Sequence, residues 1–191
     1  MIIEIKEYLK YVLIVGMKNF KVANYDEVYY RIEKINNNLK IQFVDSSKIL
    51  DSSHIYFATK NALKAFKNKR NISKNLAIEI LLYLAGKKQI DEVIGVFGIN
   101  KEIKNPIMIA VADKKEDLEK LEQNIKHSLG IDFDDSIIEN DSKNKIEIIK
   151  NVFNITDLEI EAIKRKGEAY RNIIKKLIIE RIALLYTGIR I

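Results

Sequence analysis

Residues 53–86, SHIYFATKNALKAFKNKRNISKNLAIEILLYLAG, decide the fold class because they predict two consecutive helices. Ser52 or Ser53 is the expected N-cap of the first helix, whose apolar residues recur at helical spacing. The second helix is expected to begin after Ser73 as N-cap and to end at Gly86, since glycine suits the left-handed position after a helix. Two helices in succession break the strand–helix alternation that a parallel α/β sheet requires.

The segments on both sides are shorter and more β-branched, which is typical of buried strands. We predict strands at 11–16, 41–44 and 106–112, helices at 25–35, 114–128 and 168–186, and either a strand or a short helix at 92–99. The expected fold class is therefore α+β, a single domain with a small, mostly antiparallel sheet flanked by helices. The expected organisation is an α+β domain over 1–150 and a C-terminal helical arm over 151–191, packed on the same domain.

The composition limits the class of protein. The 191 residues include no cysteine, which excludes disulfides and thiolate metal sites and favours a reducing compartment. We expect a cytoplasmic protein, because the chain has no stretch of the roughly 18 apolar residues that read as a membrane span. The net charge of +6 favours polyanionic partners. Abundant Ile, Lys and Asn also fit the coding bias of an AT-rich genome, which is the alternative explanation for the lysine excess.

A basic stretch without any acidic residue lies between Ser52 and Ile78. On a helix that advances about 100° per residue, three of its lysines share one side, opposite the apolar residues. The charge continues through the following turn, and we propose a phosphate-binding face on this basis. The alternative is a solvated lysine face. The candidate residues are Lys60, Lys64, Lys67, Lys69, Arg70 and Lys74, with Lys87 and Lys88 as weaker members.

Signatures of catalysis or metal binding are absent from the sequence. The close glycine pair, Gly95 and Gly98, has no following Lys-Ser or Lys-Thr, so it does not form a phosphate-binding loop. His54 and His127 lack a ligand partner at helical spacing, and we expect a surface or capping role for His54 and a favourable helix-terminal position for His127. The acidic segment 130–145 is expected to be a mobile loop. We therefore expect no enzymatic activity, no metal and no cofactor.

The last predicted helix is apolar over well over half of its circumference, whereas a surface helix needs only a stripe about 100° wide. The surplus indicates either complete burial or a second protein on its outer side. We favour a partner-binding face drawn from Ile174, Leu177, Ile178, Ile182 and Leu185.

The order of several short motifs resembles a known family. Residues 51–62, 72–81, 89–93 and 97–99 read DSSHIYFATKNA, ISKNLAIEIL, QIDEV and FGI. In this order they resemble the TPRKB-like, kinase-binding subunit of the KEOPS complex in its archaeal type. Glu79, the pair Gln89-Ile90 and the triplet Phe97-Gly98-Ile99 match family positions.

This resemblance implies an accessory subunit of the complex that installs threonylcarbamoyladenosine in tRNA. In that family the subunit is not the transferase. It binds the small atypical kinase subunit and, in archaea, the tRNA near its 3′ CCA end, and it meets the other KEOPS subunits only indirectly. The resemblance also implies an α+β fold. The alternative hypothesis is an enzyme or an adaptor that acts on an anionic ligand without binding RNA.

Overall fold

The computed structural model describes residues 1–18, 20, 30, 34, 39–129 and 131–187. Within this part the chain forms two compact units, each made of two separate segments. Unit 1 comprises Met1–Ser46 and Gly98–Ile138, and unit 2 comprises Ser47–Phe97 and Glu139–Ile191. The described residues form eight α-helices and five strands, which confirms the predicted α+β class.

Unit 1 is built on an antiparallel sheet with the strand order β1-β2-β4-β3. Its strands are β1 (Ile2–Ile5), β2 (Lys10–Lys18), β3 (Lys40–Asp45) and β4 (Pro106–Ala112), with the short β5 (Asp132–Phe133) paired to the end of β2. A 3-10 turn, η1 (Lys6–Tyr8), joins β1 to β2. The strands predicted at 11–16, 41–44 and 106–112 are confirmed, whereas β1 and β5 were not predicted.

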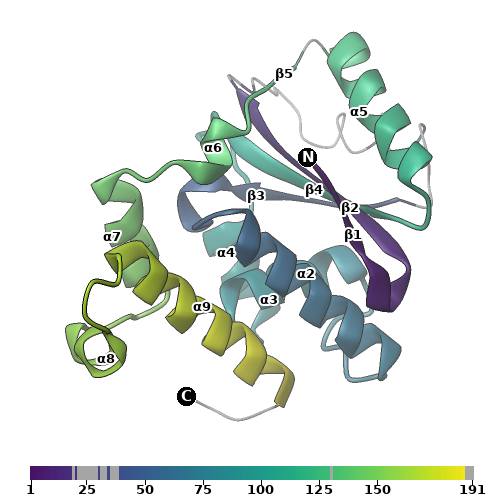
Figure 1. The fold of residues 1–191 in the computed structure, drawn as a ribbon. Helices are drawn as coiled ribbons and strands as arrows, with labels where there is room; N and C mark the ends of the chain where they lie inside the picture. The colour runs from purple at the N-terminus through teal and green to yellow at the C-terminus, as the bar shows by residue number, and fades with distance from the viewer. Residues whose placement is uncertain (19, 21–29, 31–33, 35–38, 130, 188–191) are drawn as a thin grey trace. The chain divides into compact units, whose positions relative to one another are not determined.

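The core of unit 1 lies between the sheet and helix α5 (Lys115–Leu129), which runs along one face of the sheet (Figure 1). Leu118, Leu121 and Ile125 recur at helical spacing and are fully buried. They pack against alternate residues of the central strands, among them Leu13 and Met108. The helix predicted over 114–128 therefore has the inward face that its sequence indicated.

Gly16 on β2 allows the chain after β5 to pass very close to the sheet. A Cβ atom at this position would lie 2.4 Å from the backbone oxygen of Asp134 and 2.9 Å from Cβ of Ile137. The Asp134 N–H donates to the Gly16 carbonyl at 2.9 Å. The close approach, rather than an unusual backbone angle, requires glycine here.

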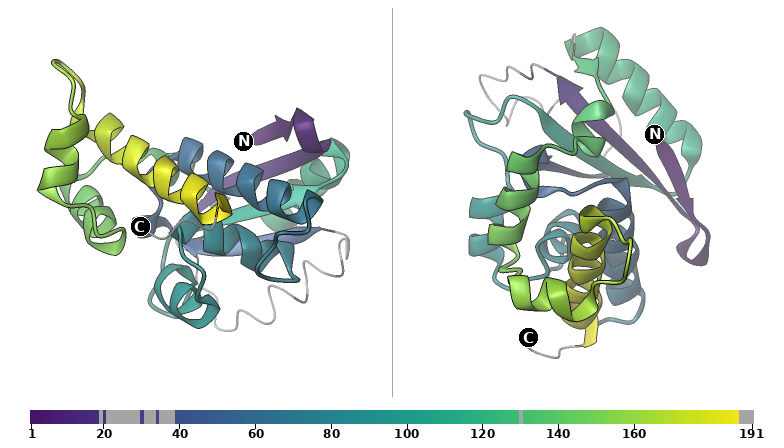
Figure 2. Two further views of the ribbon diagram at one scale, coloured as in Figure 1. Left: turned by 90° about the horizontal axis from the view of Figure 1, so that it is seen from below. Right: turned by 60° about the vertical axis from the view of Figure 1, so that its left-hand side comes forward.

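Unit 2 is helical. Its elements are α2 (Ser52–Lys67), α3 (Leu76–Ala85), α4 (Ile90–Phe97), α7 (Lys143–Val152), α8 (Asp157–Ile163) and α9 (Tyr170–Thr187). Helix α2 packs against both α3 and α9, and the two further views show α9 running alongside α2 (Figure 2). Two short elements, η2 (Ser46–Lys48) and α6 (Ser136–Glu139), lie where the chain crosses between the units.

The helix caps differ from the prediction in two places. Asp51, not Ser52 or Ser53, is the N-cap of α2, and its carboxylate accepts the His54 N–H at 3.0 Å. Asn75, not Ser73, caps α3 by accepting the Ala77 N–H at 2.8 Å. Asp and Asn are both preferred N-cap residues. The sequence therefore predicted the type of capping residue but not which of several neighbouring candidates takes the position.

Three further predictions have clear outcomes. Gly86 ends α3 in the left-handed conformation, as predicted, with φ at 63°. The segment 92–99 takes the helical alternative, as α4. The acidic segment 130–145, expected to be a loop, holds β5, α6 and the first residues of α7 where it is described. The helix predicted over 25–35 lies outside the described residues apart from Tyr30 and Lys34, which are helical.

Candidate nucleic-acid interface

The basic residues of the candidate phosphate-binding face lie on one end of unit 2. Lys60, Lys64 and Lys67 belong to α2, whose opposite side is buried through Ala58, Ala62 and other apolar residues. All of the face except Lys60, which is half-buried, is exposed, and it continues over the turn between α2 and α3 through Lys69, Arg70 and Lys74. We call these six residues the basic surface.

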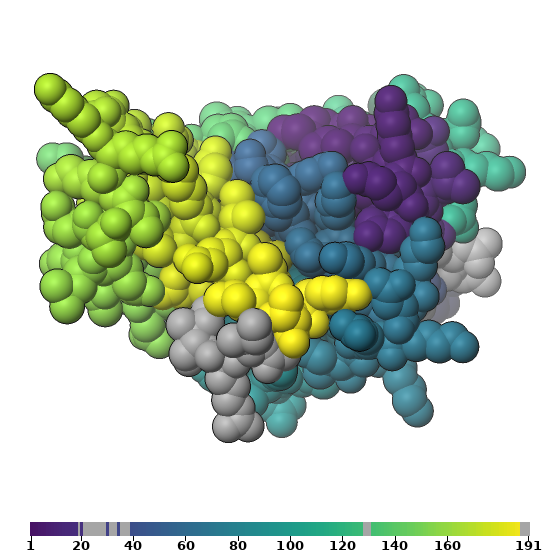
Figure 3. All heavy atoms as spheres, turned by 60° about the horizontal axis from the view of Figure 1, so that its bottom comes forward, coloured from purple at the N-terminus to yellow at the C-terminus, as the bar shows by residue number. Residues whose placement is uncertain are grey.

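A tyrosine from the far end of the chain joins the basic surface. Tyr186, in the last turn of α9, has its ring centroid 4.3 Å from the Lys64 ammonium and 5.6 Å from the Arg70 guanidinium carbon. Its hydroxyl accepts a hydrogen bond from the Asn68 side chain at 2.8 Å. Figure 3 shows α9 (yellow) against the blue segment of α2 on this face of unit 2. Sequence reasoning missed Tyr186, because 118 residues separate it from Asn68.

A second aromatic side chain stands beside the first lysine of the face. The Lys60 ammonium lies 6.0 Å from the centroid of the Tyr56 ring, one helical turn earlier on α2. The Tyr56 ring is itself held edge-on against Phe57, with the ring centroids 5.4 Å apart. Proteins that bind single-stranded nucleic acids commonly combine cations with aromatic rings. The cations bind the phosphates, and the bases stack on the rings.

The turn that carries Arg70 and Lys74 is held in place by a buried carboxylate. Glu79 is fully buried on α3, and its oxygens accept the backbone N–H groups of Ile72, at 3.0 Å, and Ser73, at 2.7 Å. Burial raises the pKa of the Glu79 carboxyl, and the two N–H donors oppose that shift. The carboxylate therefore fixes the backbone on which two of the six basic residues are presented.

The start of the same turn is also well defined. Lys69 adopts a left-handed conformation, with φ at 54°, and the Arg70 N–H donates to the Ala65 carbonyl at 2.8 Å. This is the pattern by which helices commonly end. The basic surface thus sits on backbone that is bonded at both ends, which lowers the entropy lost when a ligand binds.

Lys87 and Lys88 lie apart from the six residues of the basic surface. They follow α3, whose ten residues span about 15 Å, and Lys74 precedes the other end of that helix. Lys87 is also paired with Glu92, its ammonium 2.5 Å from the carboxylate. The structure therefore brings Lys60, Lys64, Lys67, Lys69, Arg70 and Lys74 together but separates the two weaker candidates from them.

The predicted partner-binding residues on α9 are all buried. The exposed fraction is 0% for Ile174, Ile178 and Ile182, 3% for Leu177 and 8% for Leu185. They face α2 and α3 within unit 2. A side chain buried in this way offers no free surface to a second protein, so the burial favours the alternative that these residues form core. Their role in binding a partner stays a prediction.

An ion cluster fastens the other end of α9 to the start of α2. The buried Asp51 carboxylate, which caps α2, lies 2.5 Å from the Lys175 ammonium and 4.0 Å from the Arg171 guanidinium. Arg171 also donates to the Leu50 carbonyl at 3.0 Å. Nearby, burial and the Arg171 charge lower the pKa of Lys145 to about 8. These contacts are structural, since each charge is matched by a neighbour inside unit 2.

His54 was expected at the surface or in a capping role, and the surface position is wrong. Its side chain is fully buried, because α2 turns this position towards α3. Its Nδ1 accepts the Leu50 N–H at 3.2 Å, and its Nε2 lies 2.9 Å from the Leu84 carbonyl, to which it donates. Burial lowers the pKa of the imidazole to about 4. His54 is therefore a neutral core residue. His127 lies in the last turn of α5, as predicted.

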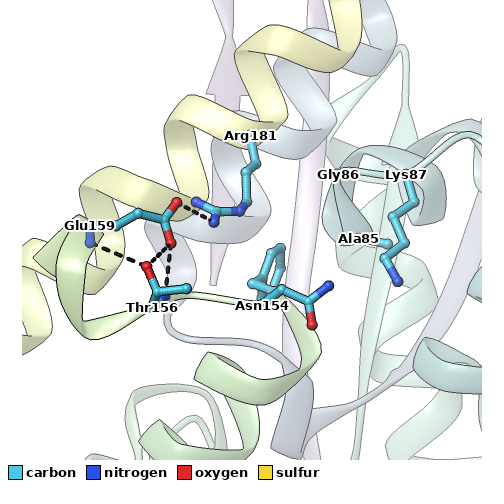
Figure 4. Close-up of a pocket in the computed structure, with 8 residues that line it drawn as sticks. Ala85, Gly86, Lys87, Asn154, Thr156, Glu159 and Arg181 are labelled. Carbon is cyan, nitrogen blue, oxygen red and sulfur yellow. Dashed lines mark hydrogen bonds and ion pairs between the residues drawn. The ribbon is translucent and has the colours of Figure 1, made fainter. Parts of the chain in front are cut away.

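Unit 2 contains a cavity of about 410 Å³ (Figure 4). Its walls are the end of α3, the turn before α8, Glu159 and Arg181. The Arg181 guanidinium donates to Glu159 at 2.8 Å, and Glu159 forms a capping box with Thr156 at the start of α8. Lys87, also in the wall, is the residue paired with Glu92. With both cations of its wall paired, the cavity presents no unmatched charge to a ligand.

The described part of the chain has neither a metal-binding cluster nor a membrane-spanning helix. Within it, no group of three or more His, Cys, Asp or Glu side chains is placed to hold a metal ion. No helix among these residues is both long and apolar enough to cross a membrane.

Comparison with known proteins identifies the family. The family model described as "Kinase binding protein CGI-121" matches residues 20–186, which is most of the chain and includes both the basic surface and α9. The chain belongs to the CGI-121 family. The predicted relationship to the kinase-binding subunits of KEOPS is thereby confirmed.

Curated relatives agree with this assignment. The CGI-121 chain is 26% identical over 153 residues to "Regulatory protein Cgi121" of Methanocaldococcus jannaschii, which covers 80% of this chain and 88% of that protein. It is 44% identical over 59 residues to "KEOPS complex subunit Cgi121" of Pyrococcus abyssi, or 31% of this chain and 34% of the relative. It is 27% identical over 95 residues to "EKC/KEOPS complex subunit CGI121" of Coccidioides immitis, or 49% and 46%. The matches to the last two thus span less than half of each relative.

Proposed function

We propose that this chain is a non-catalytic accessory subunit of a KEOPS complex, where it binds both the kinase subunit and the tRNA. In this role it supports threonylcarbamoyladenosine modification of tRNA and holds the tRNA near its 3′ CCA end. The family description and the names of the relatives support membership of the complex and binding of a kinase. Binding of tRNA is supported by the geometry of the basic surface.

The observation that carries the tRNA proposal is the meeting of Lys64, Arg70 and Tyr186. Cations alone would supply salt-dependent affinity for any phosphate backbone. An aromatic ring among them adds a stacking surface for an unpaired base, and such stacking contributes about 1–3 kcal/mol per base. A single-stranded end has both accessible phosphates and unstacked bases, whereas a duplex has only the former.

The most direct test compares tRNA with an intact CCA end to the same tRNA with that end removed. We expect the full-length chain to bind the intact tRNA more tightly, measured by fluorescence anisotropy at several salt concentrations. The affinity for intact tRNA should fall with salt with a slope of about 0.7 for each single-stranded phosphate contact. Equal affinity for both RNAs would contradict recognition of the end.

The surface itself is tested by reversing charge. Lys67→Glu with Arg70→Glu should abolish binding of intact tRNA and leave the thermal midpoint unchanged, because both side chains are exposed. The matched control is Lys143→Glu with Lys166→Glu, which makes the same change in net charge at exposed positions of unit 2 away from the basic surface. If the two double variants lose the same affinity, net charge rather than this surface is responsible.

The accessory role is tested with the isolated chain and with the reconstituted complex. The isolated chain should show no turnover of ATP or of the modification reaction, and the double variant in the basic surface should slow modification of tRNA by the complete complex. Turnover by the isolated chain would contradict the accessory role.

A further inference from the structure

The segment between α2 and α3 carries two of the six basic residues on backbone that has no regular structure of its own. Residues 70–75 lie in neither a helix nor a strand, and Arg70 and Lys74 are both exposed. The lysines of α2 take their direction from the helix that carries them. Arg70 and Lys74 instead depend on the contacts that hold this segment against the rest of unit 2.

Glu79 makes the contact that ties the middle of this segment to a helix. Within the segment, the Asn71 side chain donates to the Ser73 carbonyl at 2.9 Å, and the Ser73 hydroxyl accepts the Asn75 N–H at 3.1 Å. These bonds each span only two residues. The Glu79 carboxylate comes from the first turn of α3 and accepts the N–H groups of both Ile72 and Ser73. It therefore anchors the segment from outside.

The two N–H groups that Glu79 binds form an anion site that the chain fills itself. Successive backbone N–H groups that point to the same side make a concave site for an anion. Here the N–H groups of Ile72 and Ser73 converge on one carboxylate, so they are not available to a phosphate. The segment is left with the side chains of Arg70 and Lys74 as its groups for binding phosphate, and the carboxylate sets where they lie.

The buried charge of Glu79 is in itself unfavourable for stability. The side chain is 0% exposed, and no Lys or Arg among the described residues forms an ion pair with it. Burial raises the pKa of its carboxyl although the N–H groups of Ser73 and Ile72 lower it, so the cost of burial exceeds the gain from these two bonds. A costly charge at a position that orients two basic side chains indicates a role in binding a ligand.

We propose that Glu79 is a positioning residue for tRNA binding, an inference that rests on the proposed function. Its carboxylate holds the backbone so that Arg70 and Lys74 face the same RNA phosphates as the lysines of α2. By charge alone, an anion beneath the basic surface repels RNA. The positioning effect therefore has the opposite sign to the electrostatic effect, and a variant without the charge separates the two.

The test measures the affinity of full-length Glu79 variants for intact tRNA by fluorescence anisotropy. In either orientation, the amide of Glu79→Gln places its NH₂ group beside an N–H donor of the segment, so the anchor is lost. Glu79→Gln should weaken binding at least fivefold, whereas removal of the charge alone would strengthen it. Asp51→Asn is the matched control. It neutralises another buried carboxylate of unit 2, at the opposite end of α2, and should not weaken binding.

A double-mutant cycle shows whether Glu79 acts through the two basic residues. In an Arg70→Ala, Lys74→Ala background, measured at low salt, Glu79→Gln should have no further effect on tRNA affinity, because the side chains that it positions are gone. In a Lys67→Ala background, which removes a lysine of α2 instead, Glu79→Gln should keep its full effect. A loss of the same size in both backgrounds would show a general structural role and overturn the inference.

Glu79→Asp keeps the test decisive if Glu79→Gln does not fold. It retains the charge but shortens the side chain by one methylene, so it should also weaken tRNA binding, while circular dichroism shows that the variant is folded. Loss of the fold in both variants would make Glu79 a residue of stability and overturn the inference. If folded Glu79 variants bind tRNA as the unmodified chain does, the inference fails and the proposed function stands. If Lys67→Glu with Arg70→Glu leaves tRNA binding unchanged, the proposed function itself fails.

Discussion

Helices α9 and α4 belong to the same unit, and both are rich in apolar residues, but the two helices bury these residues to different extents. In α9 the five residues that sequence analysis offered to a partner are at most 8% exposed. In α4, Ile94 is 45% exposed and Val96 is 37% exposed, with Gly95 between them in sequence. An apolar surplus in the sequence therefore does not show by itself whether a helix face is exposed. The difference arises because α9 packs against both α2 and α3, whereas α4 packs on α3.

The largest expected effect is the difference in the free energy of unfolding between two variants, one at an isoleucine of α9 and one at an isoleucine of α4. Ile178→Asp on α9 should destabilise the chain by more than about 4 kcal/mol, because it puts an unpaired charge into a fully buried site. Ile94→Asp on α4 should cost only about 1 kcal/mol, because this side chain is partly exposed. Urea denaturation of both variants measures the difference. Equal losses would show that the two helices are equally buried.

The buried side of unit 2 also predicts a pH dependence through His54. The folded pKa of about 4 lies below the ordinary value of 6.5, so the unfolded chain binds more protons between these pH values. The contribution is complete above pH 6.5, is lost as the pH falls towards 4, and amounts to about 3 kcal/mol. His54→Gln should remove this part of the pH dependence, measured by urea denaturation from pH 4 to 7. His127→Gln, at an exposed histidine, is the control and should leave it unchanged.

Two glycines extend the same contrast between covered and open positions. Gly16→Ala in unit 1 should destabilise the chain by about 1–3 kcal/mol, since the new methyl group would overlap the Asp134 carbonyl. Thermal and urea unfolding measure this loss. A variant as stable as the parent would mean that the segment after β5 moves away at little cost.

The smallest effect has the opposite sign. Gly95→Ala on α4 should stabilise the isolated chain by about 0.5–1 kcal/mol, because alanine favours the helix and its methyl group meets open space. The measurement is the same urea titration that is used for Gly16→Ala. Destabilisation would show that Gly95 is packed inside the chain, and the comparison between α9 and α4 would then fail.

Much of the fold was accessible from sequence. Segments such as 106–112 and 114–128 were predicted within a residue or two, because their hydrophobic periodicity is set locally. The caps of α2 and α3 were misplaced by one or two residues, since several Ser, Asn and Asp residues compete there. Strands β1 and β5 were missed because they are short and lie beside polar residues.

The candidate site was predicted in part. The lysines of α2 were found because an acid-free, one-sided pattern is visible in a single helix. Tyr186 was not found, because its approach to Lys64 and Arg70 depends on how α9 packs along α2. The same packing buries the apolar residues of α9, which the sequence pattern alone could not show.

The sequence by itself determined the α+β class, the position of most helices and strands, the basic side of α2 and the resemblance to KEOPS subunits. These properties follow from local periodicity, charge and motif order, which are present in the sequence itself. Only the tertiary structure decided that His54 is a neutral core residue, that Tyr186 joins the basic surface, and that the five apolar residues of α9 are buried. Burial depends on which elements pack together, and residues far apart in sequence decide that.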